Sequence, residues 1–383
     1  MTKKRGHGEG SIYKRKDGIW TAQVTVQGKQ IYKYFKTQRD ALDWIHETKT
    51  QIRSGVSIRA ANITLKEYLD EWLVSHKSAV RPKTIYQYSQ IVRQHIVPVL
   101  GKIKLKDLNP KHIQSLYNFK IETGVSKRSV VLIHSILHKA LNQALRWELI
   151  GRNPAHAVSR PKTGRKEMKT LSDSQARTFL SAAKESRYEM LYWLAISTGM
   201  RQGELLGLKW SDLDWINGSF QVQRQLQRID GEGLVFSEPK SLASNRSVLI
   251  SITMLDRLRN HLDYQIQEKR LLGEKWEEND MMFPSTTGTP ADHRNLFRDF
   301  KSILKKAELP DIRFHDLRHT AATLMLEQGV HPKVVQERLG HADITLTLNT
   351  YSHVMPSMQE EAAKKMDALL NPIEVSGDFN DLQ

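Results

Sequence analysis

The strongest constraint on the fold is a change in hydrophobic period about sixty residues into the chain. Between Trp20 and Gln27, apolar and polar side chains alternate with a period of two, which is typical of a strand with one buried face. Between Ser126 and Gly151, an apolar stripe follows the helical period instead. Its members are Val130, Ile133, Ile136, Leu137, Ala140, Leu141, Ala144 and Leu145. The chain therefore begins as a small sheet and continues as a helical body.

The first sixty residues carry half of the excess charge. They hold 13 Lys and Arg against 5 Asp and Glu, and the whole chain has a formal net charge of +16. Turn signals at 16–18 and 27–29 predict a three-stranded antiparallel sheet, and Thr37 is placed to cap a following helix. A small sheet with a polar outer face and basic flanks can enter a DNA major groove, although a solvated sheet in an adaptor is the alternative. The candidate DNA contacts here are Thr21, Gln23, Thr25 and Lys33.

The amino-acid composition limits which partners the protein can bind and which catalytic groups it can use. The length of 383 residues is enough for two or three domains, and the basic balance favours nucleic acid. The absence of cysteine excludes disulfides, thiolate catalysis and Cys-ligated zinc. We find no apolar run that could span a bilayer and no secretory signal. These features predict a cytoplasmic, nucleoid-associated protein without a membrane partner.

The middle of the chain, residues 64–160, is predicted to be all helical, with four candidate helices. His134 and His138 have the spacing of helical metal ligands, but without a third ligand we interpret them as ordinary helix residues. Residues 159–170 are basic, contain Pro and Gly, and are predicted to be a linker that could follow a phosphate backbone. The candidate phosphate contacts are Lys83, Lys127, Arg128 and Arg165. Taken singly, each of these charges is equally well explained as a solvated surface residue.

Residues 166–372 are predicted to form a mostly helical domain with a small antiparallel sheet. The strands are predicted at 219–226, 234–240 and 244–251, the first two as a hairpin, with Lys240 in the turn after the second. A final amphipathic helix is predicted near 357–370, followed by an acidic tail at 373–383.

Residues 312–351 hold the most reactive side chains. His315 and Arg318 are three residues apart on one predicted helix and point the same way. Gly340-His341 and Tyr351 follow. A phenol is only about one part in a thousand ionised at neutral pH, and a strongly positive pocket could offset that penalty. The same pocket would stabilise a phosphorane-like transition state, so attack on a phosphate fits these residues better than attack on a carbonyl.

A zinc site is the rival interpretation of the same stretch. His315 and His319 have the spacing of the HExxH helix, but Asp316 would have to replace its glutamate. Arg318 would repel a dication, and no third ligand is evident. We therefore predict no metal site.

Taken together, STGMRQGELLGLKW, Lys240, HDLRHTAATLMLEQG, LGH and NTYSHV resemble the signature of the tyrosine recombinases, the phage integrase family. The similarity extends to integrases of Gram-positive prophages and conjugative transposons. In that resemblance, residues 1–58 correspond to an arm-type DNA-binding domain, 64–160 to a helical core-binding domain, and 166–372 to the catalytic domain with its C-terminal exchange helix. The set that carries it is Arg201, Lys240, His315, Arg318, His341 and Tyr351.

The resemblance implies strand transfer without metal, ATP or cofactor, similar to the chemistry of type IB topoisomerases. Tyr351 would attack the scissile phosphate, holding the DNA 3′ end as a phosphotyrosine and freeing a 5′ hydroxyl. The resemblance also implies a role for each residue. Arg201 and Arg318 would bind the non-bridging oxygens, Lys240 would protonate the leaving oxygen, and His315 would accept the proton of Tyr351. His341 would bind the phosphate, and Glu204 would orient Arg201 and His315.

The resemblance also implies partners: double-stranded DNA with core-type and arm-type attachment sites, a homo-tetramer on that DNA, a host DNA-bending protein and an excisionase. The expected function is integration and excision of a prophage or mobile element. A chromosome-dimer recombinase is one alternative, and the arm-like first residues argue against it. A DNA-binding regulator that does not cut is the other, and the intact set of six residues argues against that.

Overall fold

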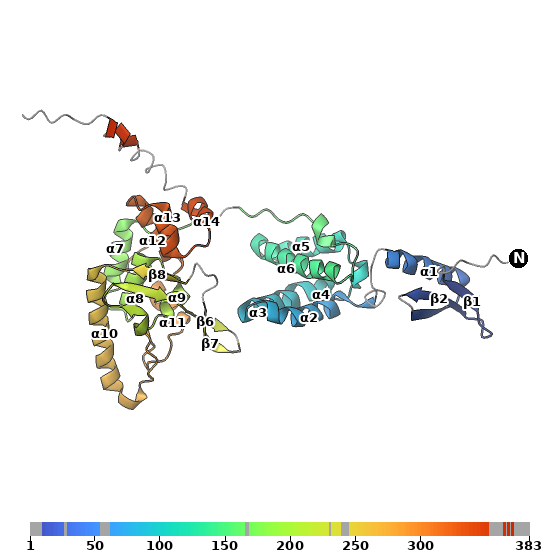
Figure 1. The fold of residues 1–383 in the computed structure, drawn as a ribbon, viewed down its shortest axis with the longest axis horizontal. Helices are drawn as coiled ribbons and strands as arrows, with labels where there is room; N and C mark the ends of the chain where they lie inside the picture. Colours follow the sequence, from blue (N-terminus) through green and yellow to red (C-terminus); the bar gives the residue numbers. More distant parts are fainter. Residues whose placement is uncertain are drawn as a thin grey trace, which may run out of the picture. The chain divides into compact units, whose positions relative to one another are not determined.

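The computed structural model divides into two compact units, residues 1–165 and 166–383. The described residues are 10–26, 29–53, 62–164, 168–229, 231–238 and 245–351, together with 363, 364, 366, 367, 369 and 370. Helices predominate, and the strands form small antiparallel sheets (Figure 1). The predicted fold class is therefore confirmed.

The N-terminal part is a three-stranded antiparallel sheet with a helix packed on it. The sheet has the order β1 (Ser11–Lys14), β2 (Trp20–Val26), β3 (Lys29–Phe35), and the helix is α1 (Gln38–Arg53). Thr37 Oγ1 accepts a hydrogen bond from the Asp40 amide (3.2 Å) at the helix start, as the capping pattern predicts. The buried core consists of Ala22, Val24, Ala41 and Ile45.

The second part of this unit is a helical body with its own core. Its α-helices are α2 (Leu65–His76), α3 (Pro82–Ile91), α4 (Val97–Leu100), α5 (Pro110–Glu122) and α6 (Lys127–Arg146). Thr64 and Glu67 form the capping box of α2, and Ser126 caps α6. The apolar stripe of α6 is buried as predicted, except for Leu145, which is exposed.

One predicted helix is interrupted. The second of the four candidate helices corresponds to residues 82–101 and is predicted as one helix, but α3 and α4 are separated by a π-helical turn, Val92–Ile96. Pro98 has no N–H to donate to the carbonyl four residues back, so the regular helical ladder cannot continue through it.

The second unit contains eight α-helices and five strands among its described residues. The helices are α7 (Asp173–Ala182), α8 (Glu189–Thr198), α9 (Gln202–Leu206), α10 (Ile252–Leu272), α11 (His293–Lys306), α12 (Asp316–Glu327), α13 (Pro332–Leu339) and α14 (Ile344–Tyr351). The strands are β4 (Leu213–Asp214), β5 (Ser219–Val222), β6 (Gln225–Ile229), β7 (Gly233–Ser237) and β8 (Arg246–Leu249).

The strand pairing differs from the prediction. The stretch 219–226 was expected to be one arm of a hairpin, but it divides into β5 and β6. β5 pairs with β4 and β8, whereas among the described residues β6 pairs with β7 alone. At the break, Arg224 turns back to form an ion pair with the buried Asp212. As a result, β8 lies beside the buried strand β5 and is not a third strand of the β6–β7 hairpin.

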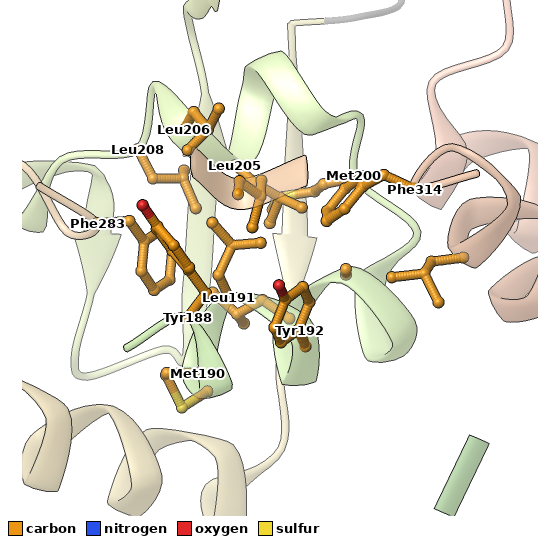
Figure 2. Packing of buried hydrophobic residues seen from close by; sticks show 14 of the residues in the cluster. Tyr188, Met190, Leu191, Tyr192, Met200, Leu205, Leu206, Leu208, Phe283 and Phe314 are labelled. Carbon is orange, nitrogen blue, oxygen red and sulfur yellow. The ribbon is translucent and has the colours of Figure 1, made fainter. Parts of the chain in front are cut away.

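The core of this unit surrounds α8, which is buried on nearly all sides. Leu191 and Tyr192 of α8 pack with Leu205 of α9, with Phe314 before α12 and with Met200 (Figure 2). Among the described residues, no helix has both the length and the apolar character needed to cross a bilayer.

Candidate active site

The site is built on the turn that ends α8. Gly199 has a left-handed backbone (φ +67°), and a Cβ there would lie 2.5 Å from Leu339 Cδ2, so glycine is required. The Gly199 carbonyl accepts a hydrogen bond from Arg318 Nη1 (2.8 Å). Arg201 follows two residues later at the start of α9. The turn therefore brings together two arginines that are far apart in sequence.

Arg201 is held by Glu204 and by the end of α13. Glu204 Oε1 accepts from Arg201 Nη1 (2.7 Å), and Oε2 accepts from the Arg201 amide (2.9 Å). Arg201 Nη2 donates to the carbonyl of Gly340 (3.2 Å). Glu204 is 2% exposed, whereas the Arg201 side chain is 34% exposed. The predicted orienting role of Glu204 has this contact as its physical basis.

A third arginine, Arg246, completes this network and was given no role by the sequence. Its Nη2 donates to Glu204 Oε2 (3.0 Å) and its Nε to the carbonyl of Arg338 (2.7 Å). Burial alone would raise the pKa of Glu204, but Arg246 and then Arg201 outweigh it, so the pKa is lowered. Glu204 is therefore ionised at neutral pH.

Arg318 is buried without enough partners. Its residue is 3% exposed, and although Nη1 donates to the Gly199 carbonyl, the buried Nη2 has no hydrogen-bond partner among the described residues. Burial, followed by the nearby charge of Arg201, lowers the pKa of Arg318 to about 9, which still leaves the guanidinium charged at neutral pH. A buried donor without an acceptor is costly, and an anionic ligand would remove that cost.

Two histidines of α12 lie beside Arg318. The rings of His315 and His319 meet edge to face, with centroids 5.2 Å apart. Burial, with smaller effects of His319 and Arg318, lowers the pKa of His315 to about 4. Burial also lowers the pKa of His319. Both rings are therefore neutral at neutral pH and can accept a proton.

His341 follows the left-handed Gly340 that ends α13. Its Nδ1 lies 2.8 Å from Thr347 Oγ1, so a bond to a further group would have to come from Nε2. The Gln336 side chain donates to the His341 carbonyl (2.6 Å) and fixes the backbone. Burial, together with Arg318 and Arg201, lowers the pKa of His341 to about 3.

Tyr351 ends α14 and is 1% exposed. Its ring packs with Ala322, Leu326, Val335 and Leu339. Its Oη lies 2.8 Å from Nδ1 of His319. Burial raises the pKa of Tyr351 to about 12, although the charge of Arg318 acts in the opposite direction. The phenol needs a proton acceptor before it can act as a nucleophile, and His319 is in contact with it.

The charges of the site do not balance. Arg201 and Arg246 both lower the pKa of Arg318, whereas the carboxylate of Glu204 and, more weakly, Tyr351 act in the opposite direction. Three guanidiniums therefore face one carboxylate, and the histidines are neutral. Such a site stabilises an anion with two or more charges. Within the described residues, no group of three or more His, Asp or Glu side chains is arranged to hold a metal ion.

Comparisons with known proteins agree with this arrangement. The phage integrase family matches residues 169–358, and its N-terminal SAM-like domain matches residues 64–121. The chain is 31% identical over 381 residues to the protein named tyrosine recombinase XerC-like of Caldanaerobacter subterraneus subsp. tengcongensis, covering 92% of this chain and 97% of that protein. The chain belongs to the phage integrase family.

Two further similarities support the same assignment. This chain is 28% identical over 336 residues to the ICEBs1 integrase of Bacillus subtilis (strain 168), covering 87% of this chain and 91% of that protein. It shares its fold with the Tn1549 transposon integrase in complex with a circular intermediate DNA, with a TM-score of 0.68 and 21% identity over 79% of this chain and all of that one. The predicted function as a tyrosine-recombinase integrase of a mobile element is thereby confirmed.

The fold of the integrase brings together the predicted residues that can be seen. Arg201, Glu204, His315, Arg318, His341 and Tyr351 lie in one connected site. Lys240 and Arg165 lie outside the described residues. Sequence reasoning considered His319 only as a zinc ligand, although its spacing from His315 already indicated a shared helix face. Arg246 gave no signal of its own, because its role depends on the pairing of β8 with β5.

The predicted DNA contacts of the N-terminal sheet do not share one surface. Thr21 is 0% exposed, since its cross-strand neighbours on the outer face are Tyr13 and Tyr34. Lys33 pairs with the buried Ala22, so it lies on the face covered by α1. Thr21 is therefore not accessible to DNA, and Lys33 is exposed but lies on the face opposite the other candidates. Of the four residues, Gln23 and Thr25 remain on the outer face, with Gln23 half-buried and Thr25 exposed.

The predicted phosphate contacts of the helical body are accessible. Lys83 lies at the start of α3, and Lys127 and Arg128 lie at the start of α6. All three are exposed.

Proposed function

We propose that this integrase cuts and rejoins DNA through a covalent bond between Tyr351 and the 3′ phosphate, without metal and without ATP. The observation that carries the proposal is the placement of the Tyr351 phenol against His319 and within the field of Arg318, in a site with two excess positive charges. A phosphodiester supplies the missing negative charge, and the transition state adds more of it.

In the cutting step, Tyr351 Oη forms a bond to phosphorus while the bond from phosphorus to the 5′ oxygen breaks. The phenolic proton passes to a neutral imidazole, and the leaving 5′ oxygen takes a proton from Lys240. Arg201 and Arg318 bind the non-bridging oxygens, where each such donor contributes about 3–4 kcal/mol of transition-state stabilisation. Rejoining reverses these steps, and because the phosphotyrosine conserves the bond energy, no nucleotide is consumed.

The geometry favours His319 over His315 as the proton acceptor. Nδ1 of His319 is 2.8 Å from Tyr351 Oη, within direct hydrogen-bond reach. With its proton on Nε2, His319 accepts from the phenol through Nδ1. His315 contacts the ring of His319 and is thereby placed to bind phosphate or to hold His319 in position.

We further propose a division of DNA binding along the chain. The N-terminal sheet binds arm-type sites through its outer face, and the helical body binds core-type sites with the catalytic domain. The integrase acts in the cytoplasm at the nucleoid as a tetramer, assisted by a host DNA-bending protein and an excisionase. The exchanged C-terminal segment, predicted at 357–370, lies partly outside the described residues. Of the described ones, Met366, Leu369 and Leu370 are exposed, which supports an apolar face that a neighbouring subunit covers.

A nicked suicide substrate tests the chemistry. The substrate is a duplex of the junction between the encoding element and its host DNA, with a nick that lets the cut fragment diffuse away. With EDTA present and ATP absent, the full-length chain is expected to form a covalent adduct on the 3′ side, visible on a denaturing gel. Mass spectrometry of the digested adduct should locate the DNA on Tyr351.

The alternatives give different results in this assay. DNA binding without any adduct would identify a regulator that does not cut. Loss of the adduct in EDTA would contradict a metal-free mechanism, and linkage to the 5′ end would contradict the proposed polarity.

Deletion of residues 1–58 separates the two DNA-binding roles. Core-site cleavage should be nearly unchanged, whereas integration between two plasmids should fall on the order of a hundredfold, because arm binding makes the second DNA contact intramolecular. Gln23→Glu in the full chain should weaken arm-site binding. Equal integration by the truncated chain would contradict the arm-site assignment.

A further inference from the structure

Arg246 lies where three parts of the active site meet. It is the first residue of β8, and its side chain is 7% exposed. Six residues before it in the sequence is Lys240, which the proposed mechanism uses to protonate the leaving oxygen. Arg246 itself has no place in that mechanism, yet it is more deeply buried than Arg201, whose side chain is 34% exposed. A buried arginine of this kind needs a structural or functional reason.

The contacts of Arg246 form a closed network with Arg201. Both guanidiniums bind the carboxylate of Glu204, Arg201 through Oε1 and Arg246 through Oε2. Both also donate to carbonyls at the end of α13, Arg246 to Arg338 and Arg201 to Gly340. These carbonyls lie at the negative end of the helix dipole, which favours cations. The residue after Gly340 is His341, so the network also fixes the segment that carries that ring.

From these contacts we propose that Arg246 is a positioning residue, which acts through Glu204 and the Arg338 carbonyl to hold Arg201 and His341 against the scissile phosphate. The inference rests on the proposed function. Arg246 does not need to touch DNA, because its effect passes through the carboxylate that Arg201 shares.

Electrostatics give this role a signature. The charged groups that face Glu204 are Arg201 at the start of its own helix, Arg246 from β8 and Arg318 from α12. Burial raises the pKa of Glu204, and Arg246 is the largest of the opposing influences. Without Arg246, the pKa of Glu204 rises, and a larger fraction of this carboxyl is protonated at neutral pH. A protonated Glu204 holds Arg201 less firmly, and raising the pH restores the carboxylate.

The test compares single-turnover cleavage of the nicked substrate by the full-length wild type and by Arg246→Gln over a range of pH. At neutral pH, the variant should be slower by about tenfold to a hundredfold, the size of effect expected from a small misplacement of a catalytic group. The ratio of variant to wild-type rate should rise as the pH increases, but it should stay below one because pH does not restore the contact with the Arg338 carbonyl. Groups that titrate in both proteins cancel in this ratio.

Three further variants keep the test decisive. Arg246→Lys retains the charge and should recover most of the rate and the wild-type pH profile. In a Glu204→Gln background, which cannot ionise, Arg246→Gln should have a smaller effect that does not depend on pH. Arg187→Gln breaks another partly buried arginine–glutamate pair, with Glu268, in the same unit. It should lower the thermal unfolding temperature without changing the pH profile.

The outcomes separate this inference from the proposed function. If the wild type forms no adduct, the proposed function fails. If the wild type forms the adduct but Arg246→Gln cleaves at the wild-type rate, or is slower by the same factor at every pH, the positioning role is overturned. If Arg246→Gln does not fold, the rate and pH profile of Arg246→Lys decide. Recovery of most of the rate with the wild-type profile supports the role, whereas a rate lowered by the same factor at every pH contradicts it.

Discussion

Tyr351→Phe is expected to abolish the covalent adduct while leaving the fold and DNA binding intact. The substitution removes Oη, the atom that forms the bond to phosphorus, and keeps the ring that packs against Leu326 and Leu339. The lost hydrogen bond to His319 should cost only about 1 kcal/mol of stability. The measurement is the fraction of nicked DNA that becomes protein-linked, beside a mobility shift under native conditions.

Tyr192→Phe is the matched control for this result. Tyr192 is also fully buried, and its hydroxyl donates to Asp299 (2.7 Å) in the main core. This variant loses a comparable hydrogen bond but should form the adduct at the wild-type level. An adduct retained by Tyr351→Phe would show that another residue is the nucleophile.

Sequence reasoning succeeded where the signal is local. The stripe of α6 has a strong helical period, and the cap residues Thr37 and Ser126 lie next to the helices that they begin. Most of the proposed catalytic set, such as His315 with Arg318, could be predicted because its members lie within short motifs, whereas Lys240 lies in none. A local pattern of this kind survives in the fold because the neighbouring residues alone determine it.

The missing parts of the site depend on contacts between distant segments. His319 contacts Tyr351 because α14 returns to α12 after 32 residues, and no periodicity predicts that return. Arg246 reaches Glu204 across 42 residues, because β8 pairs with β5 and not with the hairpin. On the N-terminal sheet, Thr21 lies on the polar face, as the alternating pattern predicts. Its accessibility could not be predicted, because it depends on the tyrosines of the two adjacent strands.

Substitution of His319 is expected to slow cleavage more than substitution of His315. Loss of a proton acceptor typically costs 10²–10⁴-fold in rate, and only His319 touches the phenol. The comparison is between His319→Gln and His315→Gln in single-turnover cleavage of the nicked substrate. Glutamine keeps a polar side chain in both places without accepting a proton at neutral pH.

The pH dependence distinguishes the two histidines even if both variants are slow. An acceptor works only in its neutral form, so the wild-type rate should fall as the pH drops through the pKa of the acceptor. Burial lowers the pKa of His319, which places this decline below the usual range of an imidazole. His319→Gln should lose the decline, whereas His315→Gln should keep it. The opposite pattern would assign proton transfer to His315 and leave His319 to hold the phenol in place.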